Sequence, residues 1–287
     1  MADIKHVIII YNPNSTGDGQ KNARHLQAEL KQKGIVAKLV KTTHAGHGEE
    51  LARDFASAHP EGMIISSSGD GGYHEVINGV LSSKNPKAIT GLLPSGNAND
   101  HYNFVHHGDI SKRIKNSQFD KIDVLKVVTP DWTRYAHSYV GLGLTPAAGK
   151  ELTEKRPGKP RQFFLAFKHL VRPKTVTIRV DGQRHIFSNL VFSNIGHISK
   201  YFKLAEDAVV DDGLLEITRV RGHSATKLFG YVLRAGTDQI EHAPKTKKYS
   251  FQTIRAMPIQ LDGEVYSLKP HQKVTITCEH RLLYTIV

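Results

Sequence analysis

The sequence is poor in sulfur and contains no long apolar run. A single cysteine, Cys278, among 287 residues excludes a disulfide within the chain. No Cys/His cluster accompanies it, which argues against a structural zinc site and against thiol chemistry. No stretch reaches 18 uninterrupted apolar residues, and the N-terminal residues lack the pattern of a secretory signal. We therefore expect a soluble, unsecreted protein of a reducing cytoplasm.

Acidic residues are scarce relative to basic ones. The 39 Lys and Arg residues against 27 Asp and Glu give a formal net charge of +12. Such an excess attracts polyanions, and acidic lipid surfaces, nucleotide phosphates and nucleic acids all qualify. The chain is also long for a single hydrophobic core, so two domains are the better expectation.

The chain is organised around residues 63–80, where a short apolar run breaks into clustered glycines and then resumes with helical periodicity. This pattern predicts a strand, a loop and a helix. Gly69, Gly71 and Gly72 let the backbone approach a ligand closely, and the helix start offers N–H groups to an anion. Asp70 lies inside that loop, where a carboxylate repels phosphate unless Mg²⁺ or a proton intervenes. Magnesium-nucleotide chemistry is favoured, with a plain tight turn as the open alternative.

Two further strand-to-loop transitions have the same build. Residues 89–100 end an apolar strand at a Pro- and Gly-containing loop that delivers Asn97 and Asp100. Residues 7–11 form a continuous apolar run, typical of a strand covered on both faces, and lead into a loop at Asn12. The alternation of strands and helices predicts an α/β domain with a doubly wound, mostly parallel sheet. In such sheets ligands bind beyond the carboxyl ends of the strands, where all these loops fall.

From about residue 120, short β-rich runs replace the strand–helix alternation and indicate an all-β, sandwich-like second domain. We place the boundary near residue 125, which gives domains at 1–125 and 126–287. Residues 150–174 interleave basic residues with aromatic ones, as membrane interfaces do. A helix with a buried aromatic face and a solvated basic face fits that stretch as well.

Four motifs in order resemble the diacylglycerol kinase catalytic-domain family, which includes bacterial lipid kinases and the sphingosine and ceramide kinases. The family's Gly-Gly-Asp-Gly-Thr and Glu-Val-x-Asn-Gly resemble residues 68–79, and its Pro-x-Gly-Thr-x-Asn-Asp resembles residues 94–100. Asp-Asp-Gly-Leu-Leu stands at residues 211–215, and Asp-Gly-Glu stands at residues 262–264. The resemblance implies a nucleotide-binding first domain, a lipid-substrate second domain and a C-terminal tail that returns to the first.

The resemblance also implies an ATP- and Mg²⁺-dependent kinase that phosphorylates the hydroxyl of a diacylglycerol-like or sphingoid-like lipid. Glu264 would be the proton acceptor with Asp262 beside it, while Asp70 and Asp100 would organise Mg²⁺ and water. The residues implied to contact the nucleotide are Asn12, Thr42, Gly69, Asp70, Gly71, Gly72, Tyr73, His74, Glu75 and Asn97. A structural Mg²⁺ would be held by two backbone carbonyls and one carboxylate, from Val209, Leu214 and Asp212. A plain β-turn is the alternative for that segment.

The chain departs from the family pattern at four loop positions. Gly72 and Asn97 stand where the family prefers Thr, and Ser68 and Ser95 replace a Gly and usually a Leu or Ala. The loss of both Thr hydroxyls removes hydrogen bonds to phosphate, although Asn97 keeps an amide donor. One alternative is therefore a lipid-binding or regulatory protein that has lost catalysis. Another is a small-molecule kinase related to NAD kinases, which share the glycine-Asp loop.

The expected partners are the lipid substrate and an anionic membrane surface, which the protein would bind peripherally from the cytoplasm. Nucleic acid is not an expected partner. The sequence leaves the oligomeric state open, a homodimer included.

Overall fold

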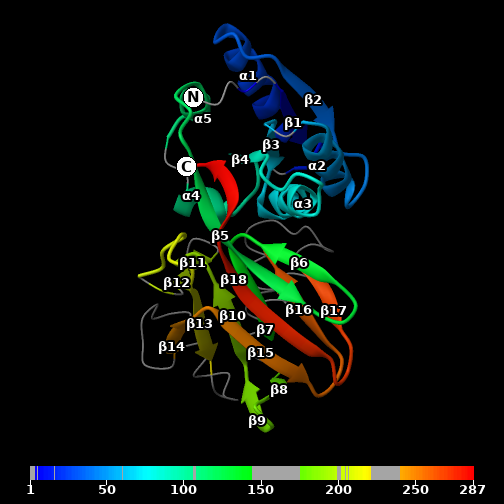
Figure 1. Ribbon diagram of the computed structural model, residues 1–287, viewed down its shortest axis with the longest axis vertical. Helices are drawn as coiled ribbons and strands as arrows, with labels where there is room; N and C mark the ends of the chain where they lie inside the picture. The colour runs from blue at the N-terminus through cyan, green and yellow to red at the C-terminus, as the bar shows by residue number, and fades with distance from the viewer. Residues whose placement is uncertain are drawn as a thin grey trace. The chain divides into compact units, whose positions relative to one another are not determined.

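The computed structural model of the protein describes residues 4, 6–15, 17–59, 61–105, 108–143, 175–198, 202–203, 205, 207–220 and 240–287 (Figure 1). The chain forms two compact units, each assembled from separate stretches of sequence. Unit 1 comprises Met1–Val124, Val210–Asp212 and His280–Val287, and unit 2 comprises Leu125–Val209 and Gly213–Glu279. The basic and aromatic stretch 150–174 lies outside the described residues.

Unit 1 alternates strands with helices. Its elements are β1 Val7–Tyr11, α1 Gly19–Gln32, β2 Ala37–Lys41, α2 His47–Ala58, β3 Met63–Ser68, α3 Asp70–Leu81, β4 Ile89–Pro94, α4 Asp100–Val105 and α5 Ile110–Lys115. The strands pair in parallel in the order β2-β1-β3-β4. The carboxyl ends of β1, β3 and β4 therefore lie at one edge of the sheet, as the fold class predicted from the sequence requires.

The apolar run of β1 explains its central place in that sheet. All five residues are buried, and Val7, Ile9 and Tyr11 share one face with Ala23, Leu26 and Leu30 of α1 in a single hydrophobic cluster. Ile8 and Ile10 alternate to the opposite face and are also buried. A strand buried on both faces needs apolar residues at every position, which is the pattern of the sequence.

Unit 2 is built from antiparallel sheets. Its strands are β6 Thr133–Ala136, β7 Tyr139–Gly143, β8 Val176–Val180, β9 Gln183–Phe187, β10 Asn189–Ser193, β11 His197–Ile198, β12 Phe202–Lys203, β13 Leu215–Val220, β14 Ile240–Thr246, β15 Lys248–Thr253, β16 Met257–Leu261 and β17 Glu264–Leu268. The strands β5 (Phe119–Val128) and β18 (Lys273–Ile286) are shared, because β5 enters this unit at Leu125 and β18 leaves it after Glu279. One sheet has the order β14-β13-β10-β7-β16-β17, and a second contains β18-β15-β8-β9 with β5 and β6.

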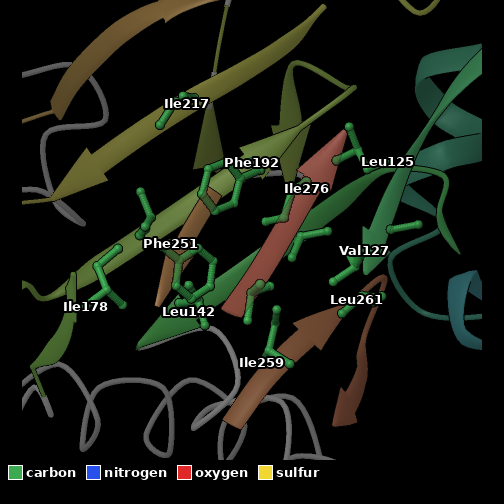
Figure 2. Close-up of a cluster of buried hydrophobic side chains, with 14 of the residues drawn as sticks. Leu125, Val127, Leu142, Ile178, Phe192, Ile217, Phe251, Ile259, Leu261 and Ile276 are labelled. Carbon is green, nitrogen blue, oxygen red and sulfur yellow. The ribbon is translucent and has the colours of Figure 1, made fainter. Parts of the chain in front are cut away.

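The core of unit 2 lies between these two sheets (Figure 2). Side chains from the six-stranded sheet, such as Leu142, Phe192 and Ile259, share one buried cluster with Ile178, Phe251 and others of the second sheet. Inward residues alternate with outward ones along each strand, so the arrangement is the expected β-sandwich.

Two β-rich runs of the sequence have other bounds in the structure. The run from residue 135 to 140 is not one strand, because β6 ends at Ala136 and β7 begins at Tyr139. His137 and Ser138 between them donate their backbone N–H groups to the Asp262 side chain rather than to a neighbouring strand. The C-terminal run at 282–287 is not a separate element, since β18 continues from Lys273 to Ile286.

The end of β18 adds a further strand to the parallel sheet of unit 1. Thr285 pairs with Thr90 of β4, and the Tyr73 hydroxyl lies 2.9 Å from Thr90 Oγ1 and 3.0 Å from Thr285 Oγ1. A Cβ added to Gly91 would lie 2.5 Å from Ile286 Cδ1, so a larger residue here would require the Ile286 side chain to shift. Residues at the two ends of the chain thus complete one sheet.

Candidate active site

Three loops meet at the carboxyl edge of the parallel sheet and contact one another through their backbones. A Cβ added to Gly96 would lie 2.5 Å from the Cα of Gly69, so the loops after β3 and β4 touch where both residues are glycine. Gly17, in the loop after β1, donates its N–H to the Ser95 carbonyl at 2.9 Å. A Cβ at Gly17 would lie 2.8 Å from the same carbonyl oxygen. The glycines that the sequence singled out after β3 and β4 are therefore required for loop packing.

Hydroxyl and amide side chains that sequence reasoning missed hold the three loops together. The Ser67 hydroxyl donates to the Gly19 carbonyl at 2.8 Å. The Asn22 amide donates to the Gly17 carbonyl and to Ser95 Oγ, both at 2.9 Å, and the Ser15 hydroxyl donates to the Ser95 carbonyl. A signal for this network was available, since Ser66–Ser68 are hydroxyl residues at the end of a fully buried strand.

Asp70 connects the glycine loop to the next helix. It is the first residue of α3, and its Oδ2 and Oδ1 accept the N–H groups of Asp100 at 3.1 Å and His101 at 3.2 Å. The positive end of the α4 backbone favours a carboxylate in that position. The structure therefore brings the Asp70 carboxylate to the backbone of Asp100, the acidic residue predicted from the other motif.

Ser68 and Gly72, two of the departures from the family pattern, are spatial neighbours. A Cβ added to Gly72 would lie 2.5 Å from Ser68 Oγ and 2.6 Å from Ser68 Cβ. Because the Ser68 Cβ is fixed to the backbone, a Thr at position 72 does not fit beside it without a shift. Ser68 thus places a hydroxyl in the space that a Thr side chain at position 72 would occupy.

Glu75 serves the neighbouring helix. Its Oε1 accepts the N–H of Gly46 at 2.8 Å, and its Oε2 accepts the N–H of Gly48 at 2.9 Å. These groups belong to the start of α2, where Gly46 has a φ of 84° that favours glycine. Both oxygens of Glu75 therefore hold the loop that carries Thr42, whose own N–H donates to the Tyr11 carbonyl at 2.9 Å.

The other predicted nucleotide-contacting residues differ in exposure. Tyr73 and His74 are buried as whole residues, which leaves almost no surface of either for contact with a ligand. Asn12 shapes its own loop, because its Oδ1 accepts the N–H of Asn14 at 2.8 Å. Asn97 is exposed, and Gly69, Gly71 and Gly72 are partly exposed.

In unit 2 the Asp-Gly-Glu motif forms the hairpin between β16 and β17. Glu264 is the first residue of β17 and is exposed. Asp262 is only 2% exposed, and its carboxylate accepts three backbone N–H groups. The catalytic role expected of Asp262 stays a prediction, and its burial and hydrogen bonds favour a structural part beside Glu264.

The segment predicted to hold a structural Mg²⁺ is a turn before β13. Val209 is 44% exposed, Asp212 is exposed and Leu214 is half-buried. Asp211 beside them accepts a hydrogen bond from Arg281 Nη1 at 2.8 Å. Among the residues that the structure describes, no group of three or more His, Cys, Asp and Glu side chains could hold a metal ion. A set with two backbone carbonyls and one carboxylate is of another kind, so this site stays a prediction.

Comparison with known proteins shows what the residues around this site resemble. The model of the diacylglycerol kinase catalytic domain matches residues 6–127, which include β1 to β4 and the loops behind them. These residues are thus similar to the diacylglycerol kinase catalytic-domain family. The family is one of lipid kinases, and lipid kinase is the class of enzyme that the match supports.

Similarity to diacylglycerol kinases extends beyond the matched segment. A Staphylococcus saprophyticus protein described as a diacylglycerol kinase is 25% identical over 91% of this chain and 89% of its own. A Bacillus subtilis protein of the same description is 24% identical over 95% of this chain and 94% of its own. Two crystal structures from Bacillus anthracis each cover 99% of this chain and 97% of theirs. The first aligns with this chain at a TM-score of 0.76 and 19% sequence identity. The second, described as a diacylglycerol kinase, aligns at a TM-score of 0.70 and 18% sequence identity, so the fold is shared.

None of the helices in the described part of the chain is both long enough and apolar enough to span a bilayer.

Proposed function

We propose that this lipid kinase transfers the γ-phosphate of ATP, together with Mg²⁺, to a hydroxyl of a diacylglycerol-like or sphingoid-like lipid. The observation that carries the proposal is the backbone packing of three glycine-containing loops at the carboxyl ends of β1, β3 and β4. Helices begin behind these loops, and their N-terminal N–H groups suit the phosphates of a nucleotide.

The start of α3 is the proposed position of the nucleotide phosphates. Glu75 and Asp70 already supply carboxylates to the N-termini of α2 and α4. Among the described residues, no side chain caps α3 at Gly69, so the N–H groups at this helix start suit an anion. Asn97, from the loop after β4, is exposed and carries an amide donor for the same phosphates.

Asp70 and Asp100 are the proposed ligands of the Mg²⁺ that accompanies ATP. Both are carboxylate residues of the loops at the carboxyl ends of β3 and β4, and carboxylate oxygens are the hard ligands that Mg²⁺ takes in proteins. When bound, the ion neutralises charge on the transferring phosphoryl group. Val209, Asp212 and Leu214 remain the proposed holders of a second, structural Mg²⁺.

Glu264 is the proposed general base. Its exposed carboxylate would accept the proton of the lipid hydroxyl as the hydroxyl oxygen bonds to the γ-phosphorus. The bond from that phosphorus to the bridging oxygen breaks, and ADP leaves with the electron pair. The absence of Thr at positions 72 and 97 favours an alternative, a lipid-binding homologue with impaired catalysis.

We further propose that the basic protein binds anionic membranes peripherally from the cytoplasmic side. Exposed charges are screened over about 8–10 Å near physiological ionic strength, so binding to anionic vesicles should weaken steeply as salt rises. Equal binding to neutral vesicles at every salt concentration would contradict this part of the proposal.

Phosphate transfer from labelled ATP to a panel of dispersed lipids tests the function. The panel should include diacylglycerol, a sphingoid base and, outside the lipids, NAD. We expect Mg²⁺-dependent labelling of a lipid and none of NAD. Lipid binding without any labelling would favour the impaired homologue, and labelling of NAD alone would refute the lipid kinase.

A further inference from the structure

Unit 2 contains two hairpins with the same Asp-Gly turn. Asp181 and Gly182 join β8 to β9 with φ values of 49° and 80°, and Asp262 and Gly263 join β16 to β17 with φ values of 49° and 103°. Positive φ at both positions of a two-residue turn is the type I′ geometry, which favours Asp-Gly and Asn-Gly. Asp181 is exposed. The turn itself therefore does not require a buried carboxylate, and the burial of Asp262 needs another explanation.

The Asp262 carboxylate is held by the strand entrance at residues 137–139. Its Oδ2 accepts the N–H of His137 at 2.9 Å, and its Oδ1 accepts those of Ser138 at 2.9 Å and Tyr139 at 3.1 Å. The N–H of Asp262 in turn donates to the Tyr139 carbonyl at 3.1 Å. A buried charge is tolerated only when it is hydrogen-bonded in this way.

His137 adds a side-chain contact to the same carboxylate. Its Nε2 lies 3.5 Å from Asp262 Oδ2, and both side chains are fully buried. Its Nδ1 lies 2.7 Å from the Ser138 hydroxyl. The imidazole ring therefore bridges the Asp262 carboxylate and the Ser138 hydroxyl through its two nitrogens.

We infer that His137, Ser138 and Asp262 form a buried latch that positions Glu264. The latch joins the start of β7 to the turn between β16 and β17. The pairing of β16 with both β7 and β17 extends this constraint to Glu264. Leu261, the residue before the turn, pairs with Val140 of β7 on one side and with Glu264 of β17 on the other. The latch therefore fixes both ends of the short path that leads to Glu264. The inference rests on the proposed role of Glu264 and makes the three latch members positioning residues, not catalytic ones.

The central test is Asp262→Asn with Asp181→Asn as its matched control. Asn-Gly keeps the preferred turn in both hairpins, so only the charge and acceptor capacity of the side chain change. In the lipid phosphorylation assay we expect kcat of Asp262→Asn to fall about 10–100-fold, with an unchanged KM for ATP. Asp181→Asn should behave like the wild type. Wild-type kcat in Asp262→Asn would overturn the inference.

The pH profile distinguishes a positioning residue from a base. If Glu264 is the base, the acid limb of kcat persists in Asp262→Asn at a lower plateau. Loss of that limb would make Asp262 the base and refute the latch. Should Asp262→Asn fail to fold, His137→Phe with His137→Gln gives the second test, since both keep the backbone bonds and only Gln keeps an N–H donor. We expect Gln to restore part of the kcat that Phe loses, and equal kcat values for both variants and the wild type would overturn the inference.

Hydrogen exchange at the amides of residues 137–139 separates the latch from the proposed function. Exchange should accelerate about tenfold in Asp262→Asn and stay unchanged in Asp181→Asn. A wild type that phosphorylates no lipid would overturn the proposed function and with it the positioning role. Unchanged exchange in an active protein would overturn the latch alone.

Discussion

The two units use carboxylates against backbone N–H groups in different ways. In unit 1, Asp70, Glu75 and Asp109 each accept such groups at the start of a helix, and none of the three is fully buried. In unit 2, Asp262 accepts them at the entrance to a strand and is buried. A helix start adds its dipole to the hydrogen bonds, whereas a strand entrance offers only the bonds themselves. The three carboxylates at the helix starts can thus stay open to a ligand, whereas Asp262 is closed off from solvent.

Asp70→Asn removes a carboxylate at a helix start of unit 1 and should have the largest effect on phosphate transfer. The amide still resembles the carboxylate in shape, but it cannot balance Mg²⁺ charge and can accept only one of the two N–H groups. We expect labelled-phosphate transfer to lipid to be abolished and the free energy of unfolding to drop by about 1–2 kcal/mol in urea titration. Near-normal transfer would show that Asp70 is only a turn residue. Asp109→Asn, at an exposed helix start of the same unit, is the control.

Glu264→Gln tests the exposed carboxylate of unit 2 that lies beside the buried one. The exposed neighbour of the buried Asp262 is the proposed base, and the loss of general-base assistance lowers rates by roughly 10²–10⁴-fold. We expect kcat to fall by that factor while the KM for ATP changes little, as steady-state kinetics would show. Glu279→Gln, on β18 of the same unit, should leave kcat unchanged. A Glu264→Gln variant as active as the wild type would leave the motif as a plain hairpin.

Glu75→Gln tests whether a carboxylate at a helix start supports nucleotide binding indirectly. An amide side chain offers one acceptor to Gly46 and Gly48, so the loop that carries Thr42 should loosen. We expect the KM for ATP to rise about 3–10-fold while kcat stays close to that of the wild type. Glu50→Gln, on the exposed surface of α2, is the control. A fall in kcat without a change in KM would instead point to a direct role of Glu75 in the reaction.

The smallest effect is expected at Asp109, the N-cap of α5. The Ser111 hydroxyl, which donates to Asp109 at 2.7 Å, lowers the pKa of this carboxyl below its ordinary 3.8. A lowered pKa in the folded state stabilises the protein above pH 3.8, and this contribution is lost as the pH falls below that value. Asp109→Ala should cost about 1 kcal/mol at pH 7 in urea unfolding. The difference from the wild type should shrink at pH 3, and a constant difference would contradict the assignment.

Much of the fold follows from local sequence, while the contacts inside the site do not. The apolar run of β1 and the spacing of Ala23, Leu26 and Leu30 specify a buried strand and an amphipathic helix by their periodicity alone. The glycine loops were predicted because a loop between strand and helix has a composition of its own. Composition does not say which loops touch, so the bonds that join Asn22 to Ser95 could not be predicted from it.

Burial of polar residues was the other limit. The sequence reads residues 135–140 as one β-rich run, and nothing local reveals that His137 and Ser138 interrupt it to bind a carboxylate 124 or 125 residues away. Asp262 likewise looks like an ordinary turn residue, because Asp-Gly favours a hairpin whether or not the Asp is buried. Only the tertiary structure distinguishes it from Asp181.

The return of the C-terminus to the first sheet limits how this protein can be divided. A fragment that ended at residue 127, where the family match ends, would leave β4 without Thr285 and expose its edge. An unpaired strand edge recruits other copies and leads to aggregation. We therefore expect a fragment with only the residues matched by the family model to be less soluble than the whole chain. A hybrid protein built around that segment would need a partner strand for β4 to close the sheet.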